Sequence, residues 1–315
     1  MPAPRRIDPP GGDLAPRLPS RSRTTALLSY LHGFHAGNHA DVFKHAILTC
    51  LLDALIRKPK PLVYLESHAG AGCYDLTDAR ALKTGESSLG IGRLWPRRQA
   101  FPQLARYLET IARLDPDGGT RLYPGSPMLA AELLRPDDRL ILMERHPAEA
   151  RTLETRLGAD RRIGIHRRDG LEGMPALVPP KPSRGLVLID PPYEQVSEYR
   201  AVADALIRAH GRWPTGVYAL WYPRLGRARD RSDLLLERIQ GAIPDGLVCE
   251  LSVRPASDDL GMHGSGMLIL NPPWGVDEGL RELLPRLAAV LADETASPDF
   301  RGWRLQALRG ATGSR

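Results

Sequence analysis

The sequence predicts an α/β fold in which helices cover both faces of a mostly parallel sheet. Short apolar runs typical of strands alternate along the chain with longer segments whose apolar residues recur every three or four positions, as in amphipathic helices. The 315 residues suffice for one large domain, and 42% hydrophobic and 25% charged residues are ordinary globular values. Such folds bind ligands beyond the carboxyl ends of the strands, where the strand order reverses.

The predicted elements follow an N-terminal segment of different character. Residues 1–27 are rich in proline and arginine and lack an apolar period, so we expect a flexible tail there and a folded domain over 28–315. Asn38 is the expected N-cap of a helix that runs to 58. Residues 75–122 break the alternation and are expected to form an inserted helical subdomain. Strands are expected at 61–67, 139–144, 161–170 with its turn, 185–190, 216–223, 247–253, 266–273 and 301–308, and further helices from Pro147, over 196–210 and over 277–292.

Composition excludes several classes of protein. No apolar run reaches the roughly 18 residues of a membrane span, and the N-terminus lacks the apolar core of a secretory signal. Cys50, Cys73 and Cys249 are too scattered for a disulfide framework or a CxxC metal site. We therefore expect a cytoplasmic protein without a membrane partner. The net charge of +6 permits a polyanionic partner but is too small to require one.

Asp190-Pro191-Pro192-Tyr193 at the end of an apolar strand is the strongest chemical signal. An exocyclic amine is a poor nucleophile, because its lone pair is delocalised into the base. A carboxylate and a backbone carbonyl that accept its two N–H groups make it more nucleophilic and stabilise the charge that develops on it. The prolines remove backbone donors, and the tyrosine ring can stack on an extruded base. The alternative is a proline-rich turn that the aspartate merely caps.

Three further features predict a nucleotide site. HAGAG (68–72) follows the first strand as a tight glycine turn, although Asp75 stands where the third glycine of a GxGxxG fingerprint belongs. Glu144 ends the next long strand, where a carboxylate can accept both ribose hydroxyls. Asp169-Gly170 follows the third strand and can border an adenine, or can be a turn alone. In this order, and followed by Asp190, they make the layout of an S-adenosylmethionine-dependent methyltransferase.

Four histidines lie within fourteen residues near the start of the domain, at positions 32, 35, 39 and 45. A metal site on a helix needs pairs at helical spacing with further ligands, as in HExxH, and no such motif occurs, so we expect no metal. Lys44 and His45 instead suit the binding of a ligand carboxylate, and plain packing at a helix start is the alternative.

The motifs taken together resemble the RlmJ-type family of 23S ribosomal RNA adenine-N6 methyltransferases. The resemblance runs from about Leu28 to the NPPW segment and beyond, so the tail is expected to be either an extension of the enzyme or the product of a start assigned too far upstream. It implies a Rossmann-like class I methyltransferase fold with an antiparallel C-terminal strand and an inserted helical subdomain. The motifs are LSYLHGFHAGNHADVFKH, YLESHAGAG, YPGSP, RRDG, GLVLIDPPYE, TGVYALWYP and SGMLILNPPW.

The resemblance also implies roles for individual residues. Asp190 is implied as the catalytic proton acceptor, and Tyr30 occupies a position associated with the RNA substrate. Glu66 stands where relatives often carry aspartate. The implied contacts of S-adenosylmethionine are Lys44, His45, His68, Ser126, Glu144, Asp169, Gly170 and Asp190.

Asn271-Pro272-Pro273-Trp274 repeats the pattern of the Asp190 motif and competes with it as the amine site. The asparagine side chain offers a carbonyl acceptor. We favour Asp190 because it ends the next strand after the Asp169-Gly170 turn, where the acceptor pocket belongs, whereas Asn271 comes three strands later.

The predicted function is methylation of the N6 amine of one adenine in 23S rRNA during ribosome biogenesis, with Asp190 and the Pro191 carbonyl on the amine and Tyr193 on the base. We expect the rRNA to be free of protein or at an early stage of assembly. The alternatives are a DNA adenine or protein glutamine methyltransferase and a catalytically silent RNA-binding module. Half of the net charge lies in the tail, so RNA binding depends on local arginines, for which the candidates are Arg161, Arg162, Arg167 and Arg168, and Arg224, Arg227, Arg229 and Arg231.

Overall fold

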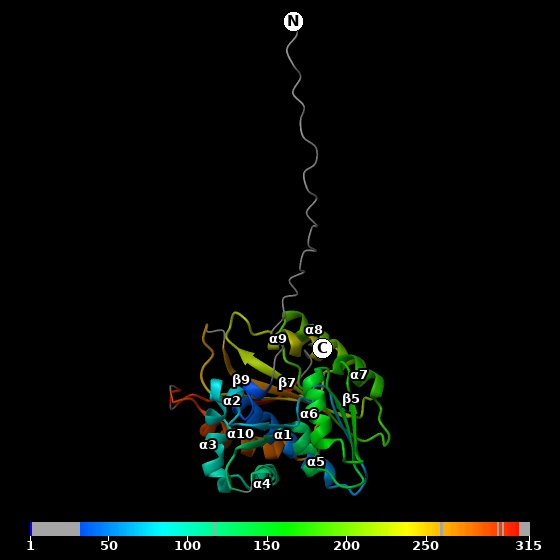
Figure 1. Cartoon of the computed structure of the whole chain (residues 1–315), viewed down its shortest axis with the longest axis horizontal. Coiled ribbons are helices and arrows are strands. Elements are labelled where there is room, and N and C mark those ends of the chain that lie inside the picture. The colour runs from blue at the N-terminus through cyan, green and yellow to red at the C-terminus, as the bar shows by residue number, and fades with distance from the viewer. Residues whose placement is uncertain (2–31, 116, 259–260, 295, 298, 309–315) are drawn as a thin grey trace, which may run out of the picture. The chain divides into compact units, whose positions relative to one another are not determined.

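One eight-stranded sheet organises the chain in the order β10-β8-β9-β7-β6-β1-β4-β5. This computed structural model describes Met1 and residues 32–308 apart from 116, 259, 260, 295 and 298, so Tyr30 and the predicted tail beyond Met1 lie outside the described residues. Every described residue except Met1 belongs to one compact unit (Figure 1). The strands are β1 (Val63–Glu66), β4 (Arg139–Met143), β5 (Ile163–His166), β6 (Gly185–Ile189), β7 (Val217–Leu225), β8 (Gly246–Ser252), β9 (Met262–Leu270) and β10 (Trp303–Leu308).

Strand direction is mostly uniform. β1, β4, β5, β6 and β7 pair in parallel, while β9 is antiparallel to both of its neighbours, β7 and β8. β10 is antiparallel to β8, as expected for the C-terminal strand. Only β9 and β10 therefore run against the rest of this sheet. The predicted mostly parallel sheet is confirmed, but the reversal of β9 was not predicted.

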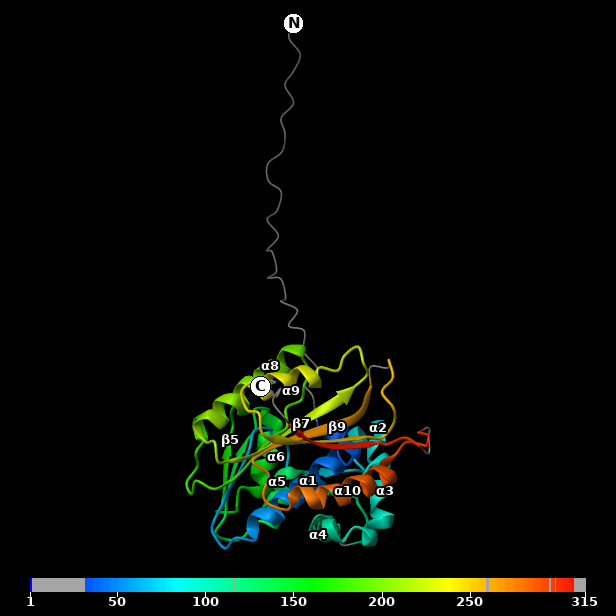
Figure 2. The ribbon, with the colours of Figure 1, turned by 180° about the vertical axis from the view of Figure 1, so that it is seen from behind.

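The alternation of side chains along the strands divides the core into two layers. Tyr64 of β1 packs on the face covered by α1 (His39–Ile56), α5 (Ser126–Leu133), α6 (Pro147–Leu157) and α10 (Val276–Leu291). Leu65 packs on the opposite face, covered by α7 (Gly170–Leu177), α8 (Val196–Arg212) and α9 (Ser232–Gln240). Figure 2 shows α1 and α10 side by side on the first face, in agreement with their contacts. β1 is buried on both faces, which explains its continuous apolar run.

The segment predicted as an insertion is helical and packs on the α1 side. It lies between β2 (Cys73–Asp75) and β3 (Leu122–Pro124), which form an antiparallel pair of their own. The Ile91 amide donates to the Gly37 carbonyl (2.8 Å) just before α1, and the Arg93 guanidinium donates to the Leu291 carbonyl (3.1 Å) in α10. We propose that this segment is the inserted subdomain. Its helices are α2 (Ala79–Thr84), η2 (Glu86–Leu89), α3 (Ile91–Leu94), η3 (Trp95–Ala100), η4 (Pro102–Leu104) and α4 (Ala105–Leu114).

The strand order reverses beside β1. The chain proceeds outward from β1 to β4 and β5, then crosses back to β6 on the other side of β1. Because these four strands are parallel, the segments that follow them lie at one edge of the sheet. His68, Glu144, Asp169 and Asp190 all follow these strands, so topology alone gathers them at that edge.

Gly185→Ala is expected to destabilise the protein by roughly 1–3 kcal/mol, the usual cost of overpacking a core. A Cβ at Gly185 would lie 1.8 Å from the Val63 carbonyl oxygen on the adjacent strand. Gly211→Ala, in α8 with open space around the added methyl group, is the matched control and should stabilise by about 0.5–1 kcal/mol. Urea unfolding of both variants measures the difference. Equal midpoints would contradict the parallel register of β6 on β1.

Candidate active site

A buried ion pair lies at the centre of the candidate site. The Lys44 ammonium, on α1, lies 2.5 Å from Asp190 Oδ2 and 3.0 Å from Asp41 Oδ1. Burial alone would lower the pKa of Lys44, but Asp190 and Asp41 outweigh it and hold the pKa well above its ordinary value. Lys44 is therefore charged, and it fixes one Asp190 oxygen. The Asp190 side chain remains 15% exposed, at the end of β6.

The turn after Asp190 is held in a strained shape. Tyr193 has φ of +51°, a left-handed conformation that costs a non-glycine residue roughly 1–3 kcal/mol. Its hydroxyl donates to the Trp221 carbonyl of β7 (2.9 Å), and its ring centroid lies 4.5 Å from that of Tyr199. These contacts fix the turn and leave Tyr193 only 8% exposed. The expected stacking of Tyr193 on a base stays a prediction.

The glycine turn is tied to the acid that ends the neighbouring strand. Gly70 and Gly72 have φ of +61° and +80°, where side chains are disfavoured. The Gly70 amide donates to Glu144 Oε2 (2.8 Å), and the His146 amide donates to Glu144 Oε1 (2.6 Å). A carboxylate has about four acceptor positions, so Glu144 keeps capacity for two further donors.

Asp169 and Gly170 begin α7 beside β1. Asp169 Oδ1 accepts from the Leu171 and Glu172 amides (2.8 and 3.2 Å), which makes it the N-cap of the helix. A Cβ at Gly170 would lie 1.9 Å from the Ser67 carbonyl oxygen, so only glycine fits there. The dipeptide thus begins a helix, a role not predicted for it, and lies at the same sheet edge as Glu144; the expected contact with adenine stays a prediction.

His68 lies among the acids that follow the four strands. Burial lowers its pKa, and Asp190, Glu144 and Asp169 oppose that shift, so all three carboxylates are close enough to act on the ring. The ring Nδ1 lies 2.7 Å from the Ser67 hydroxyl. The structure therefore brings together the predicted residues that follow β1, β4, β5 and β6.

Ser126 hydrogen-bonds to a second buried carboxylate, that of Glu66, which the sequence marked only as a position where relatives often carry aspartate. The Ser126 hydroxyl donates to Glu66 Oε1 (2.5 Å), while the Tyr64 hydroxyl donates to Glu66 Oε2 (2.8 Å). Glu66 is fully buried at the end of β1, and burial raises its pKa to about 8, although both hydrogen bonds oppose that shift. Glu66 is thus mostly protonated at neutral pH.

The structure places His45 against Tyr123 of β3 and Tyr107 of the predicted insertion. Its Nδ1 lies 2.9 Å from the Tyr123 hydroxyl, whose oxygen is 2.8 Å from that of Tyr107. The His45 and Tyr123 rings stack with centroids 5.5 Å apart. Sequence patterns gave no sign of this pair, because the partner lies 78 positions away.

Asn271 lies at the opposite edge of the sheet. It follows β9, which runs against β6, and its side-chain amide donates to the Pro214 and Gly216 carbonyls (both 2.7 Å). Asn271, the first residue of its motif, has φ of +51°, whereas in the Asp190 motif the left-handed residue is the fourth, Tyr193, so the two Pro-Pro turns differ in shape. They also differ in location, and Asn271 serves to close the start of β7.

Comparison with known proteins identifies the family. A family model described as "Ribosomal RNA large subunit methyltransferase D, RlmJ" matches residues 59–305. The chain is 42% identical over 270 residues to ribosomal RNA large subunit methyltransferase J of Haemophilus influenzae, covering 85% of this chain and 95% of that protein. It is 40% identical over 265 residues to the protein of the same name from Escherichia coli K12, covering 84% and 94%. A crystal structure of a Legionella pneumophila protein matches with a TM-score of 0.79 at 33% identity, over 88% of this chain and 99% of that one.

The chain belongs to this RlmJ methyltransferase family. The resemblance expected from the motifs is confirmed, and so is the Rossmann-like α/β fold. Methyltransferases of this family imply S-adenosylmethionine as the methyl donor, as the sequence predicted.

The residues at the sheet edge fit this cofactor. The spare acceptor capacity of Glu144 suits the two hydroxyls of a ribose. Gly170 lets α7 begin directly against the Ser67 carbonyl, which holds Asp169 at the same edge.

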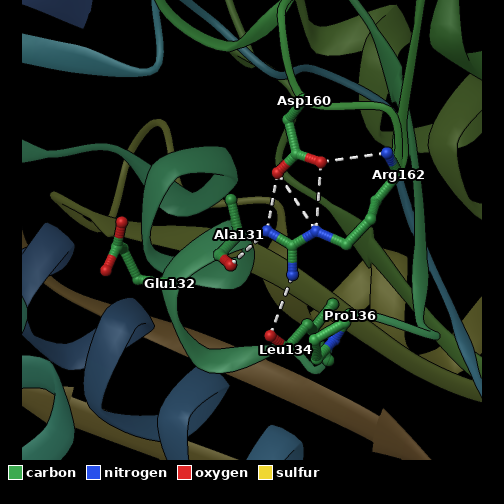
Figure 3. Close-up of a pocket in the computed structure, with 6 residues that line it drawn as sticks. All are labelled: Ala131, Glu132, Leu134, Pro136, Asp160 and Arg162. Carbon is green, nitrogen blue, oxygen red and sulfur yellow. Dashed lines mark hydrogen bonds and ion pairs between the residues drawn. The ribbon is translucent and has the colours of Figure 1, made fainter.

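The candidate RNA-binding arginines of this RlmJ-family protein divide into internal and exposed groups. Figure 3 shows Arg162 bonded to Asp160 and to the Leu134 and Ala131 carbonyls, so its side chain supports α5 rather than facing a partner. Arg224 is similarly enclosed among carboxylates, and Arg167 pairs with Glu154 on the surface. The remaining exposed candidates are Arg161, Arg168, Arg227 and Arg229.

Among the described residues, no three or more histidine, cysteine or carboxylate side chains gather as metal ligands do. Over the same part of the chain, no helix has the length and apolar character that a membrane crossing requires.

Glu66→Gln is expected to change how stability varies with pH. Because the folded pKa is about 8 against an ordinary 4.5, the unfolded chain releases a proton that the folded protein keeps between these values. The free energy of unfolding therefore falls as pH rises across this window, by at most about 1.4 kcal/mol per pH unit. Urea unfolding near pH 5 and pH 8 should show Glu66→Gln gaining stability relative to wild type as pH rises. A pH-independent difference would show that Glu66 is ionised in the folded protein.

Proposed function

We propose that this protein transfers a methyl group from S-adenosylmethionine to the N6 amine of one adenine in 23S rRNA. The curated relatives are named as methyltransferases of large-subunit ribosomal RNA. The observation that carries the choice of an amine is the position of Asp190, whose carboxylate lies beside the reversal point with one oxygen fixed by Lys44. An acceptor at that place suits a donor group on a base rather than a carbon atom.

The chain's residues prepare the amine for attack. Asp190 Oδ1 and the Pro191 carbonyl accept its two N–H groups, which stabilises the positive charge that develops on nitrogen. When bound, the cofactor supplies the electrophilic methyl group on its sulfonium sulfur. As the new C–N bond forms, the methyl–sulfur bond would break with its electron pair left on the sulfur. The nitrogen would then lose one proton, for which Asp190 is the proposed acceptor. Positioning contributes most of the rate, since oriented reactions gain on the order of 10⁵ M or more in effective molarity.

Lys44 acts in this proposal through Asp190. A buried cation 2.5 Å from one oxygen fixes the orientation of the carboxylate. The resemblance implied a cofactor contact for Lys44, and the contact with Asp190 supports a positioning role instead.

The cofactor residues are proposed in two groups. Glu144, Asp169, Gly170 and His68 lie at the common sheet edge, which supports contacts with the ribose, the adenine and the remainder of the donor. Ser126 is proposed to contact the end of the cofactor that lies farthest from the adenine, and its hydrogen bond to Glu66 fixes its hydroxyl. His45, next to Lys44 in α1, packs on Tyr123, which supports a role in shaping the site around Lys44.

We further propose that the substrate is rRNA free of protein or at an early stage of assembly, within the cytoplasm where ribosomes are made. The support is steric: Asp190 is only 15% exposed, so its adenine has to leave the RNA stack to reach it. Ribosomal proteins packed on the RNA oppose this extrusion. Protein-free 23S rRNA is expected to accept methyl groups faster than assembled large subunits, and the reverse order would overturn this part.

Asp190→Ala should lower kcat by roughly 10²–10⁴-fold, the range for loss of a positioned acid–base group. Asn271→Ala is the matched control, because it removes the corresponding side chain of the second Pro-Pro motif at the opposite edge. Its kcat should stay within about twofold of wild type. Calorimetry with S-adenosylmethionine separates loss of chemistry from loss of cofactor binding. The opposite pattern of activities would reverse the assignment of the amine site.

Lys44→Met should lower kcat by roughly 10²-fold, because Asp190 loses the cation that fixes it. Lys58→Met, at an exposed position just beyond α1, controls for loss of a lysine. The affinity for S-adenosylmethionine should change little. A large loss of that affinity with kcat preserved would instead support the cofactor contact that the resemblance implied.

Whether the substrate is RNA, DNA or protein is tested by the transfer of tritiated methyl groups. Purified enzyme is offered unmodified 23S rRNA, duplex DNA and a protein mixture in parallel. We expect incorporation into rRNA only. Incorporation into DNA or protein would support the rival amino-methyltransferases, and binding of RNA without any transfer would support the RNA-binding module.

A further inference from the structure

We propose that the loop after β7, residues 226–231, binds phosphates of the RNA strand that flanks the target adenine. The proposal rests on the proposed function and assigns part of the RNA-binding surface. It chooses between the two arginine groups of the sequence, in favour of the one that contains Arg227 and Arg229.

The loop follows β7, which lies next to β6 and extends past the end of β6, where Asp190 lies. Ile189 of β6 is in register with Leu220 of β7, so β7 continues past the end of β6 from Trp221 to Leu225. Over that distance it pairs with β9, Arg224 lying opposite Gly264. At about 3.3 Å per residue, the two strands project roughly 15 Å beyond Asp190, which is the reach of a few nucleotides. Figure 1 shows β7 running on toward the loop that leads to α9.

The charges of the loop also act on the Tyr193 turn. Burial raises the pKa of Tyr199 to about 12, and within the loop Asp230 raises it further while Arg231 and Arg229 lower it. The Tyr199 ring in turn packs on Tyr193.

The loop is rigidly supported from below. The Gly226 amide donates to the Gly261 carbonyl and the Arg227 amide to the Ser257 carbonyl (both 3.1 Å), which joins the loop to the segment before β9. The largely buried Arg224 side chain reaches Asp230, Asp233 and Glu250 (each 3.2 Å). The negative charge of Asp230, the acidic residue of the loop, is therefore neutralised by Arg224, and the outer surface of the loop keeps the positive charge of its arginines.

The exposed arginines are available to an anion. Arg227 lies 3.7 Å from Asp258, and both side chains are largely exposed, so this pair is worth little and a phosphate can replace the carboxylate. Among the described residues, Arg229 has no ion-pair partner. One guanidinium in a weak exposed pair and one without an ion-pair partner among the described residues suit phosphates, which Arg binds through paired hydrogen bonds.

A second basic surface of the described chain provides the control. Arg97 and Arg98 on η3 are exposed and hydrogen-bond only to backbone carbonyls, and Arg98 also stacks on Trp95. Neither has a carboxylate partner among the described residues. They match Arg227 and Arg229 in charge and exposure but belong to the predicted insertion, beside α10.

The test compares Arg227→Gln/Arg229→Gln with Arg97→Gln/Arg98→Gln in methylation of unmodified 23S rRNA. For the loop variant we expect the KM for RNA to rise about tenfold or more, with kcat within about twofold and unchanged affinity for S-adenosylmethionine. The slope of log(kcat/KM) against log salt concentration should become shallower by about 1.4, because each single-strand phosphate contact contributes about 0.7. The control variant should keep the wild-type KM and slope.

Two results would overturn the proposal. A loop variant with wild-type KM and salt slope would show that the loop does not bind phosphate, and an equal or larger effect of the control variant would move the RNA to the insertion. If wild-type enzyme transfers no methyl group to rRNA, the proposed function fails first, and this outcome is distinct from an active wild type with an unaffected loop variant.

Discussion

The parallel alignment of β1, β4, β5 and β6 determines where all the candidate chemistry lies. The segments after these strands carry His68, Glu144, Asp169 and Asp190, and parallel pairing brings them to one edge although they are far apart in the chain. Close packing maintains the alignment at two glycines: Gly185 leaves no room for a Cβ against Val63, and Gly170 none against Ser67. A change that shifted one strand would therefore separate the proposed donor site from the acceptor site.

The buried charges at this edge are costly, and the chain compensates for them in different ways. Lys44 is held between Asp41 and Asp190 and keeps its charge. Glu66, at the end of β1, instead keeps its proton. Buried ion pairs often contribute little net stability, so the function of Asp190 is a better reason for the Lys44 pair than folding. The strained φ of Tyr193 next to it agrees with a site whose geometry is maintained against its local preference.

Sequence periodicity was sufficient to predict the eight strands of the main sheet, because burial on both faces gives strands such as β1 and β6 continuous apolar runs. It missed β2 and β3, whose three residues each are too few for a period, and it placed β9 about four residues too late in the chain. Direction was not predictable for β9, since parallel and antiparallel strands share one side-chain period. That reversal puts Asn271 at the opposite sheet edge from Asp190, although the two look alike as motifs. The partners of Lys44 and His45 could not be predicted from the sequence either, because contacts across 146 and 78 positions leave no local pattern. Tyr30 and the predicted tail beyond Met1 lie outside the described residues.

The most direct test of the account is the identity of the methylated atom. Unmodified 23S rRNA is incubated with enzyme and S-adenosylmethionine, digested to nucleosides and analysed by mass spectrometry against synthetic standards. The account predicts N6-methyladenosine at one position, in amounts that approach one per rRNA molecule and that vanish with Asp190→Ala. Methylation of a ribose hydroxyl or of a ring carbon would contradict it, because neither reaction uses an acceptor for amine protons at the end of β6.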